Sequence, residues 1–290
     1  MGRLSAVLLL VVVLAVPGVA LAKKDCVTRY PVVFAHGMGL KTKIVGMVDY
    51  WWGIEDALTK RGAKVFFPSV NAMDSTEAKA IAFKQRFEEI LALTGAEKAH
   101  IIGHSHGTIY TRYAISNLGL GKAGKVVSYT SISGPHQGSR LGEIILLLPD
   151  FLTGPVLDFV FTWGMGDTNP DSHENFVNIT PKHMKTVFNP NVPDIENIHY
   201  QSWACRGKWA APSGILQMTW LMMLSLEGQN DGLVGVESAK WGQFRGVEKG
   251  AWYSPGVDHA NVIGHLFGVT PGFSAPEFYA EIIQGLRAHE

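Results

Sequence analysis

Short apolar runs alternate with amphipathic stretches along the first half of the chain. Strands are predicted at 29–37, 63–70, 98–103 and 125–133, and helices at 50–62, 74–95 and 107–119. The second of these helices begins with Asp74 and Glu77 in a capping-box pattern. Because strand and helix alternate and the strands are almost wholly apolar, the pattern predicts the α/β class, with a mostly parallel sheet flanked by helices.

The pattern changes near Gly142. Residues 142–166 are strongly apolar, hardly charged and interrupted by Pro149 and Pro155, which is typical of inserted helices rather than of a sheet strand. Two interpretations stay open, because these helices could complete the core or form a cap over a pocket or a lipid surface. We therefore predict a cap or lid insertion at about 140–197 within one domain.

Three further elements are predicted beyond this insertion. Residues 198–204 have the pattern of a strand that returns to the sheet, and 274–290 that of an amphipathic closing helix. The run at 214–226 has almost no polar face, so it predicts a helix that is buried or lines an apolar cavity.

Residues 1–22 have the features of a secretory signal peptide. A basic start at Arg3 precedes an apolar stretch, which ends at Pro17 and is followed by Ala20 and Ala22. The apolar run before Pro17 is shorter than the ~20 residues that cross a bilayer, which disfavours a membrane anchor. We expect cleavage near Ala22 and secretion of residues 23–290 as a single domain.

Charge and cysteine content narrow the range of functions. The chain has 25 basic and 25 acidic residues and no basic run, so nucleic acid is not an expected partner. Its two cysteines are Cys26 and Cys205. In an exported protein we expect them to form a disulfide, with two buried free thiols as the alternative.

Residues 103–107, Gly-His-Ser-His-Gly, fit the G-x-S-x-G pattern of a nucleophile elbow. The segment follows a predicted strand and opens a predicted helix, the context in which a tight turn exposes the serine hydroxyl. Ser105 is the expected nucleophile. His104 and His106 flank it directly, so their side chains diverge from the hydroxyl on a sharp turn, and no Cys, Asp or Glu lies nearby to complete a metal site.

The base and the acid are therefore expected from later loops, in the order Ser, acid, His. His259 lies in a loop flanked by Pro and Gly, whereas its competitor His265 falls within a helical pattern. Asp231 lies in an Asn-Asp-Gly turn, and its rival Asp258 directly precedes His259 and could hardly orient that ring. The expected triad is Ser105, Asp231 and His259.

Two backbone N–H groups are expected to stabilise the charge that develops on the substrate oxygen. One belongs to the residue after the nucleophile, His106, and the other to the loop after the first strand, where Met38 follows Gly37.

With these motifs together, the sequence resembles the bacterial true lipases of the Pseudomonas, Burkholderia and Proteus type. The likeness runs through YPVVFAHGM, DYWWGIEDAL, EEILALTG, HIIGHSHG, SISGPHQGS, QNDGLVG and the VDH loop with HLFGV. The resemblance implies an α/β-hydrolase fold with a helical lid, long-chain triacylglycerol substrates, the triad Ser105, Asp231 and His259, and Met38 and His106 as oxyanion donors.

The chain departs from that family in one respect. These lipases commonly hold a structural calcium through an Asp two residues after the catalytic His and another Asp before the catalytic Asp. Here Asn261 occupies the first position, and no Asp lies between Cys205 and Asn230. Calcium favours carboxylate oxygens, so we predict that this site is missing or weakened and that no cofactor is needed.

The sequence thus predicts a secreted hydrolase of lipid or other carboxylic esters, and triacylglycerol lipase is the favoured activity. A short-chain esterase, a phospholipase or a polyester hydrolase would use the same triad, and a hydrolase-like protein that binds lipid without turnover is the alternative from another class. A secretion foldase stays open as a further partner.

Overall fold

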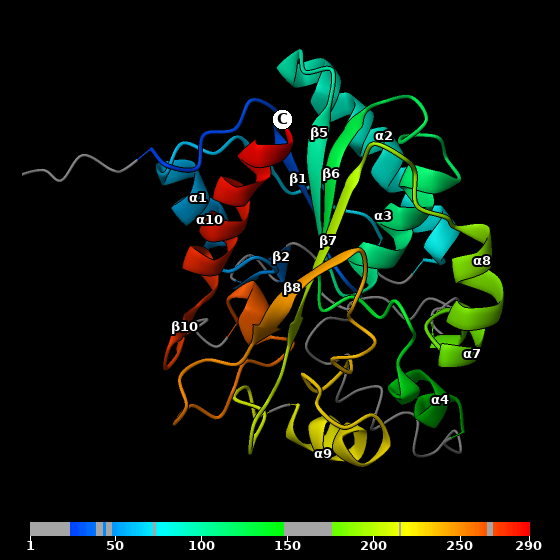
Figure 1. The fold of residues 1–290 in the computed structure, drawn as a ribbon, viewed down its shortest axis with the longest axis vertical. Helices are drawn as coiled ribbons and strands as arrows, with labels where there is room; N and C mark the ends of the chain where they lie inside the picture. The colour runs from blue at the N-terminus through cyan, green and yellow to red at the C-terminus, as the bar shows by residue number, and fades with distance from the viewer. Residues whose placement is uncertain are drawn as a thin grey trace, which may run out of the picture.

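The computed structural model describes residues 24–38, 43–44, 48–71, 74–147, 176–214, 216–265 and 269–290. Its centre is a sheet of six parallel strands in the order β4-β1-β5-β6-β7-β8 (Figure 1). The strands are β1 (Val32–Ala35), β4 (Val65–Phe66), β5 (Ala99–His104), β6 (Val126–Ile132), β7 (His199–Cys205) and β8 (Gln243–Glu248). The α/β class and the parallel sheet are confirmed.

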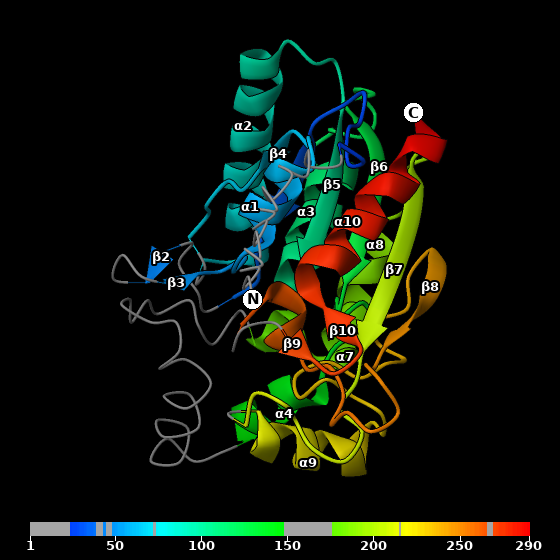
Figure 2. The same cartoon turned by 90° about the vertical axis from the view of Figure 1, so that its left-hand side faces the viewer.

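Helices cover both faces of this sheet. Helices α1 (Ile54–Lys60) and α10 (Ala275–Leu286) lie on one face, and α2 (Thr76–Thr94) and α3 (His106–Ser116) lie on the other (Figures 1 and 2). Strand side chains alternate between the two faces. Val32 and Phe34 of β1 belong to the core under α1 and α10, and Val33 and Ala35 to the core under α2 and α3.

Smaller elements surround this framework. Two antiparallel pairs join β2 (Lys43–Ile44) to β3 (Val48–Asp49) and β9 (Val269–Thr270) to β10 (Phe273–Ser274). A continuous helical segment contains α7 (Pro181–His183), a π-helical turn at Met184–Phe188 and α8 (Asn189–Asn191). The remaining elements are α4 (Arg140–Leu147), α9 (Gln217–Leu226) and 3-10 turns at Asn261–Ile263 and Arg287–His289.

Three local predictions differ from the structure. Helix α2 is capped by Ser75, whose hydroxyl accepts from the Ala78 N–H at 3.2 Å, and not by Asp74. The edge strand β8 was not predicted, because its sequence QFRGVE is half-exposed and largely polar. Helix α9 is not wholly buried, since Trp220 and Met223 face inward while Met218 is 63% exposed.

The described residues include only the two ends of the predicted cap, α4 and the segment from 176 to 197. Residues 148–175, like the predicted signal peptide at 1–22, lie outside the described residues. Within the described ranges, no helix is both long enough and apolar enough to cross a membrane.

The expected disulfide is absent, because Cys26 and Cys205 are both free and buried. The thiol of Cys26 lies 3.8 Å from the Ala280 carbonyl oxygen of α10. Burial raises the pKa of the Cys205 thiol well above its ordinary value. Each sulfur thus packs in the apolar core as a small side chain, and the alternative of two buried thiols is the correct one.

Candidate active site

Ser105 occupies the tight turn between β5 and α3. Strand β5 ends at His104 and helix α3 begins at His106, and Ser105 between them has φ 56° and ψ −133°. A positive φ is strained for a residue with a side chain and recurs at functional sites. The turn also needs Gly107, because a Cβ there would collide with the carbonyl oxygen of Ala35. The sequence therefore folds here into the elbow that the motif predicts.

Asp231 and His259 meet beside this turn, although 27 residues separate them in the sequence. The Nδ1 atom of His259 lies 2.8 Å from Oδ2 of Asp231. The other carboxylate oxygen accepts from the N–H groups of Leu233 and Val234 at 3.0 and 2.8 Å. The Asp231 carboxylate is almost fully buried, so its backbone donors and the imidazole take the place of water. This pair fixes His259 with Nδ1 as the donor and Nε2 as the acceptor.

The Nε2 atom of His259 is buried and has no hydrogen-bond partner among the described residues, Ser105 included. Such a nitrogen is available to accept a proton. In apo structures the bond between nucleophile and base is often long and tightens only with substrate. His259 also contacts the residue before the nucleophile, because the rings of His104 and His259 lie 4.4 Å apart.

A buried tyrosine connects His104 to the loop after β1. The Tyr50 hydroxyl donates to Nδ1 of His104 at 2.6 Å and accepts from the Gly37 N–H at 2.8 Å. Burial raises the pKa of Tyr50 and lowers that of His104 well below its usual value, so the first stays protonated and the second neutral. His104 thus acts as packing beside His259 and not as the base.

The loop after β1 lies directly against the nucleophile. A Cβ at Gly37 would approach Cβ of Ser105 to 2.7 Å and its Oγ to 3.1 Å, so only glycine allows this contact. Met38 follows at once and packs against the apolar cluster that includes Leu141 and Ile145 of α4. Across the turn, the N–H of His106 is one of the first in α3, which have no acceptor within a helix. Met38 and His106 therefore border the same space near Ser105.

The rival residues serve the loops around this site. The Asp258 carboxylate accepts from the N–H groups of Ser213, Ala260 and Asn261 at 2.6, 3.0 and 2.9 Å, so it shapes the His259 loop instead of orienting the ring. Nε2 of His265 lies 3.1 Å from the Tyr50 carbonyl oxygen, and burial lowers the pKa of this histidine to about 4.

Both ring nitrogens of His106, which follows Ser105, have side-chain partners. The His106 ring lies between Thr76 Oγ1, 3.0 Å from Nε2, and Lys79 Nζ, 2.9 Å from Nδ1. Across the part of the chain that the structure covers, no cluster of three His, Cys, Asp or Glu residues could hold an ion. Asn261, at the position where the resemblance would place a calcium ligand, donates through Nδ2 to the His265 carbonyl oxygen at 3.3 Å.

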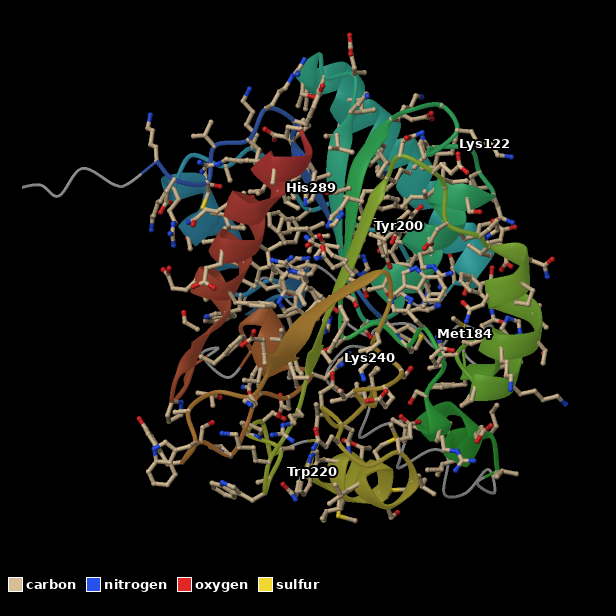
Figure 3. The ribbon with its side chains drawn as sticks, viewed as in Figure 1. Lys122, Met184, Tyr200, Trp220, Lys240 and His289 are labelled. Carbon is tan, nitrogen blue, oxygen red and sulfur yellow. The ribbon has the colours of Figure 1, made fainter. Side chains whose placement is uncertain are left out.

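Large apolar side chains are exposed at this edge of the sheet. Helix α9 precedes the Asp231 loop, and Asn230 donates to the Trp220 carbonyl oxygen at 3.2 Å. Trp252, 88% exposed, and Tyr253, 60% exposed, precede the His259 loop. We call the exposed set the apolar rim: Trp209, Met218, Leu221, Leu224, Trp252 and Tyr253. Trp220 marks this end of the molecule, and His289 marks the other (Figure 3).

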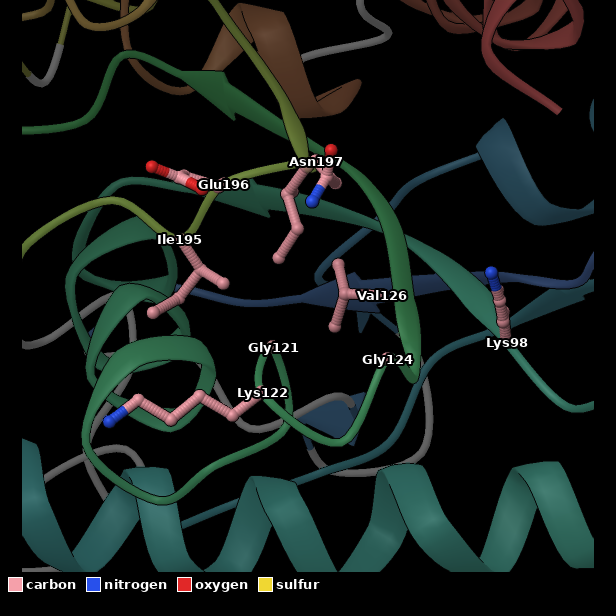
Figure 4. A pocket seen from close by; sticks show the side chains of 9 residues that line it. Lys98, Gly121, Lys122, Gly124, Val126, Ile195, Glu196 and Asn197 are labelled. Carbon is pink, nitrogen blue, oxygen red and sulfur yellow. The ribbon is translucent and has the colours of Figure 1, made fainter.

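A polar cavity of about 370 Å³ lies at the opposite edge of the sheet (Figure 4). Lys98, just before β5, and Val126, at the start of β6, line it together with Lys122 and Glu196. Ser105 follows the other end of β5, so this cavity is separate from the elbow.

Sequence reasoning missed three residues at the site, Tyr50, Thr76 and Lys79. Tyr50 lies in the DYWW stretch, and Lys79 lies in the first turn of α2, where a lysine normally faces water. No periodicity distinguishes them, because their contacts come from other elements.

Comparison with known proteins agrees with this architecture. The sequence matches the α/β-hydrolase fold family over residues 30–165. It is 40% identical over 118 residues to a triacylglycerol lipase of Vibrio cholerae, a match that covers 41% of this chain and 36% of that one. It is 34% identical over 134 residues to a triacylglycerol lipase of Burkholderia plantarii, with 45% of this chain and 36% of that one covered. The matched segments thus span little more than a third of these relatives.

Solved structures share the fold over a longer stretch. A lipase from Bacillus licheniformis in its mature form superposes with a TM-score of 0.65 at 17% identity, over 89% of this chain and 91% of that one. A metagenomic carboxyl esterase gives a TM-score of 0.67 at 16% identity, over 89% and 76% of the two chains. The chain therefore has the α/β-hydrolase fold, and part of it is similar to bacterial proteins named triacylglycerol lipase.

Proposed function

We propose that this protein is a serine hydrolase of carboxylic esters, with triacylglycerols as its preferred substrates. The observation that carries the proposal is His259, whose Nδ1 is held by Asp231 while its buried Nε2 is unbonded beside the elbow of Ser105. An imidazole oriented by a carboxylate and open on its other nitrogen is what a serine nucleophile requires.

The residues act in two half-reactions. The Ser105 hydroxyl attacks the ester carbonyl carbon while its proton passes to Nε2 of His259, and Asp231 stabilises the resulting imidazolium. The N–H groups of Met38 and His106 donate to the oxyanion. The C–O bond then breaks, His259 returns the proton to the leaving alkoxide, and an acyl-Ser105 ester remains. A water molecule, deprotonated by His259, releases the carboxylic acid and restores Ser105.

The apolar rim supports a lipid substrate. Exposed tryptophan, tyrosine and aliphatic side chains on segments next to the Asp231 and His259 loops favour contact with an oil surface over contact with a small soluble ester. The names of the Vibrio and Burkholderia relatives point the same way. A short-chain esterase, a phospholipase and a polyester hydrolase remain the alternatives with the same chemistry.

Labelling and a chain-length series test this proposal. A fluorophosphonate should label Ser105 in the folded wild-type protein and should not label the Ser105→Ala variant. Failure of the wild-type protein to react would favour a non-catalytic lipid-binding protein. The rate of hydrolysis should increase from soluble butyrate esters to emulsified long-chain triacylglycerols. A preference for soluble short esters would instead make the protein an esterase.

We also propose that residues 1–22 direct secretion. The mass of the protein recovered from outside the cytoplasm should correspond to a chain that begins at Lys23. An intact N-terminus on the active protein would contradict this.

A further inference from the structure

Lys79 lies in the interior directly behind one of the two proposed oxyanion donors. Its side chain is 1% exposed, on the first turn of α2. Its Nζ lies 2.9 Å from Nδ1 of His106, and Thr76, three residues earlier on the same helix, lies 3.0 Å from Nε2. The start of α2 thus contacts both ring nitrogens of His106, the residue whose backbone N–H is a proposed oxyanion donor.

From this arrangement we propose that Lys79 is a positioning residue for ester hydrolysis, whose ammonium fixes the His106 backbone and adds positive charge behind the oxyanion. The inference rests on the proposed function above. It assigns a role to a residue that does not touch the substrate and acts through His106.

The hydrogen bonds define how the group acts. A charged Lys79 can only donate, so Nδ1 of His106 must accept and its Nε2 proton must go to the Thr76 hydroxyl. One tautomer and one ring orientation result, and the first turn of α3 is held against the start of α2. A buried cation also interacts with a developing negative charge more strongly than an exposed one.

The titratable groups near Lys79 include two histidines and a carboxylate. His106 faces it from α3, His36 from the loop after β1 and Asp74 from the turn before α2. Burial lowers the pKa of Lys79 to about 7, while the Asp74 carboxylate acts in the opposite direction. His36 and His106 stay neutral, since burial lowers the pKa of His36 to about 4 and that of His106 well below its usual value. The ammonium is therefore the group among these that loses a proton near neutrality.

The positive charge of Lys79 assists the reaction at pH values below its pKa. The charge is lost as the pH rises through that pKa, so kcat should fall at higher pH. Arginine at this position would keep its charge throughout the working range and would remove this fall.

The test compares three lysine variants of the full chain with the wild-type protein. Each hydrolyses a soluble 4-nitrophenyl ester at pH values from 5 to 10. Lys79→Met should lower kcat about tenfold at neutral pH with KM changed less than twofold. The loss is smaller than the loss expected from removing an oxyanion donor, because the His106 N–H itself remains. Lys79→Arg should restore most of kcat and lose the alkaline fall. Lys84→Met, on the same helix but half-buried and paired with Glu88, should match the wild type.

A second measurement does not depend on turnover. The rate at which a fluorophosphonate labels Ser105 should fall about tenfold in Lys79→Met, because the phosphonyl oxygen uses the same N–H groups. Wild-type kcat in Lys79→Met, or an unchanged alkaline fall in Lys79→Arg, would overturn the proposal. If Lys79→Met does not fold, the pH profile of Lys79→Arg decides alone. A wild-type protein that neither turns over esters nor reacts with the probe would instead remove the proposed function, and this inference with it.

Discussion

Two serine–histidine–carboxylate groups lie at opposite edges of the same sheet. At the carboxyl edge are Ser105, His259 and Asp231. At the amino edge, Nδ1 of His100 lies 2.7 Å from Ser128 Oγ, and its Nε2 lies 3.3 Å from a carboxylate oxygen of Glu290. The residue types are alike, but only the first group is proposed to be catalytic.

The two groups differ in whether the histidine has a nitrogen without a hydrogen-bond partner and in where the serine lies. Both nitrogens of His100 are bonded, and Ser128 is fully buried inside strand β6. In contrast, Nε2 of His259 has no partner among the described residues, and Ser105 stands on a strained turn beside a glycine loop. A catalytic group needs an unfilled position for substrate as well as the right residue types.

Removal of each serine hydroxyl should give the largest difference in kcat between the two groups. Ser105→Ala should lower kcat by about 10⁶-fold, since the nucleophile is lost. Ser128→Ala should leave kcat within twofold and lower the free energy of unfolding by about 1 kcal/mol, because His100 loses one buried partner. Ester hydrolysis and urea unfolding measure the two effects, and a large loss of kcat in Ser128→Ala would contradict the comparison.

Substitution of the two carboxylates should also lower kcat in the first group and not in the second. Asp231→Asn should lower kcat by about 10⁴-fold, because the amide no longer holds the His259 tautomer or stabilises its charge. Glu290→Gln, at the exposed end of the other group, should leave kcat unchanged. If Asp231→Asn retained most of its activity while Asp258→Asn lost it, the acid would have been assigned to the wrong residue.

The ring of His106 provides a smaller contrast with that of His259. His106→Gln should lower kcat only about tenfold, since its backbone N–H remains and only the contacts to Lys79 and Thr76 change. His259→Gln should cost about as much as loss of Ser105. Equal losses in the two variants would mean that the His106 ring takes part in the reaction.

Buried histidines should make the fold sensitive to acid. The pKa values of His36 and His265 are both lowered from 6.5 to about 4 by burial. Each stays neutral in the folded state but binds a proton in the unfolded chain below pH 6.5, so stability is present above that value and is lost as pH falls toward 4. The free energy of unfolding should drop by about 1.4 kcal/mol per pH unit for each group. His36→Gln should reduce the measured slope, and an unchanged slope would show that His36 is already protonated in the folded protein.

Chelation should have the smallest effect. Because Asn261 replaces a carboxylate and its amide is bonded to His265, we expect excess chelator to change neither Tm nor activity measurably. Loss of either quantity, restored by added calcium, would show a site that uses other ligands.

The elements near Ser105 could be predicted because the relevant physics is local. A strand, a turn with Gly at 103 and 107 and a helix follow one another directly, and the glycines mark where backbone must approach backbone. His259 and Asp231 were chosen by chain order and loop context, and the structure places them 2.8 Å apart.

Other features depend on contacts between segments far apart in the chain, and tertiary structure alone decides them. The sequence determined the α/β class, the parallel strands and the position of the elbow, because these follow from periodicity and adjacent residues. Tertiary packing decided that Cys26 and Cys205 stay apart, that one face of α9 is exposed, and that Tyr50 and Lys79 lie at the site. No local pattern encodes which side chain from α2 will meet a ring on α3, since only burial of both helices on one sheet face brings them together.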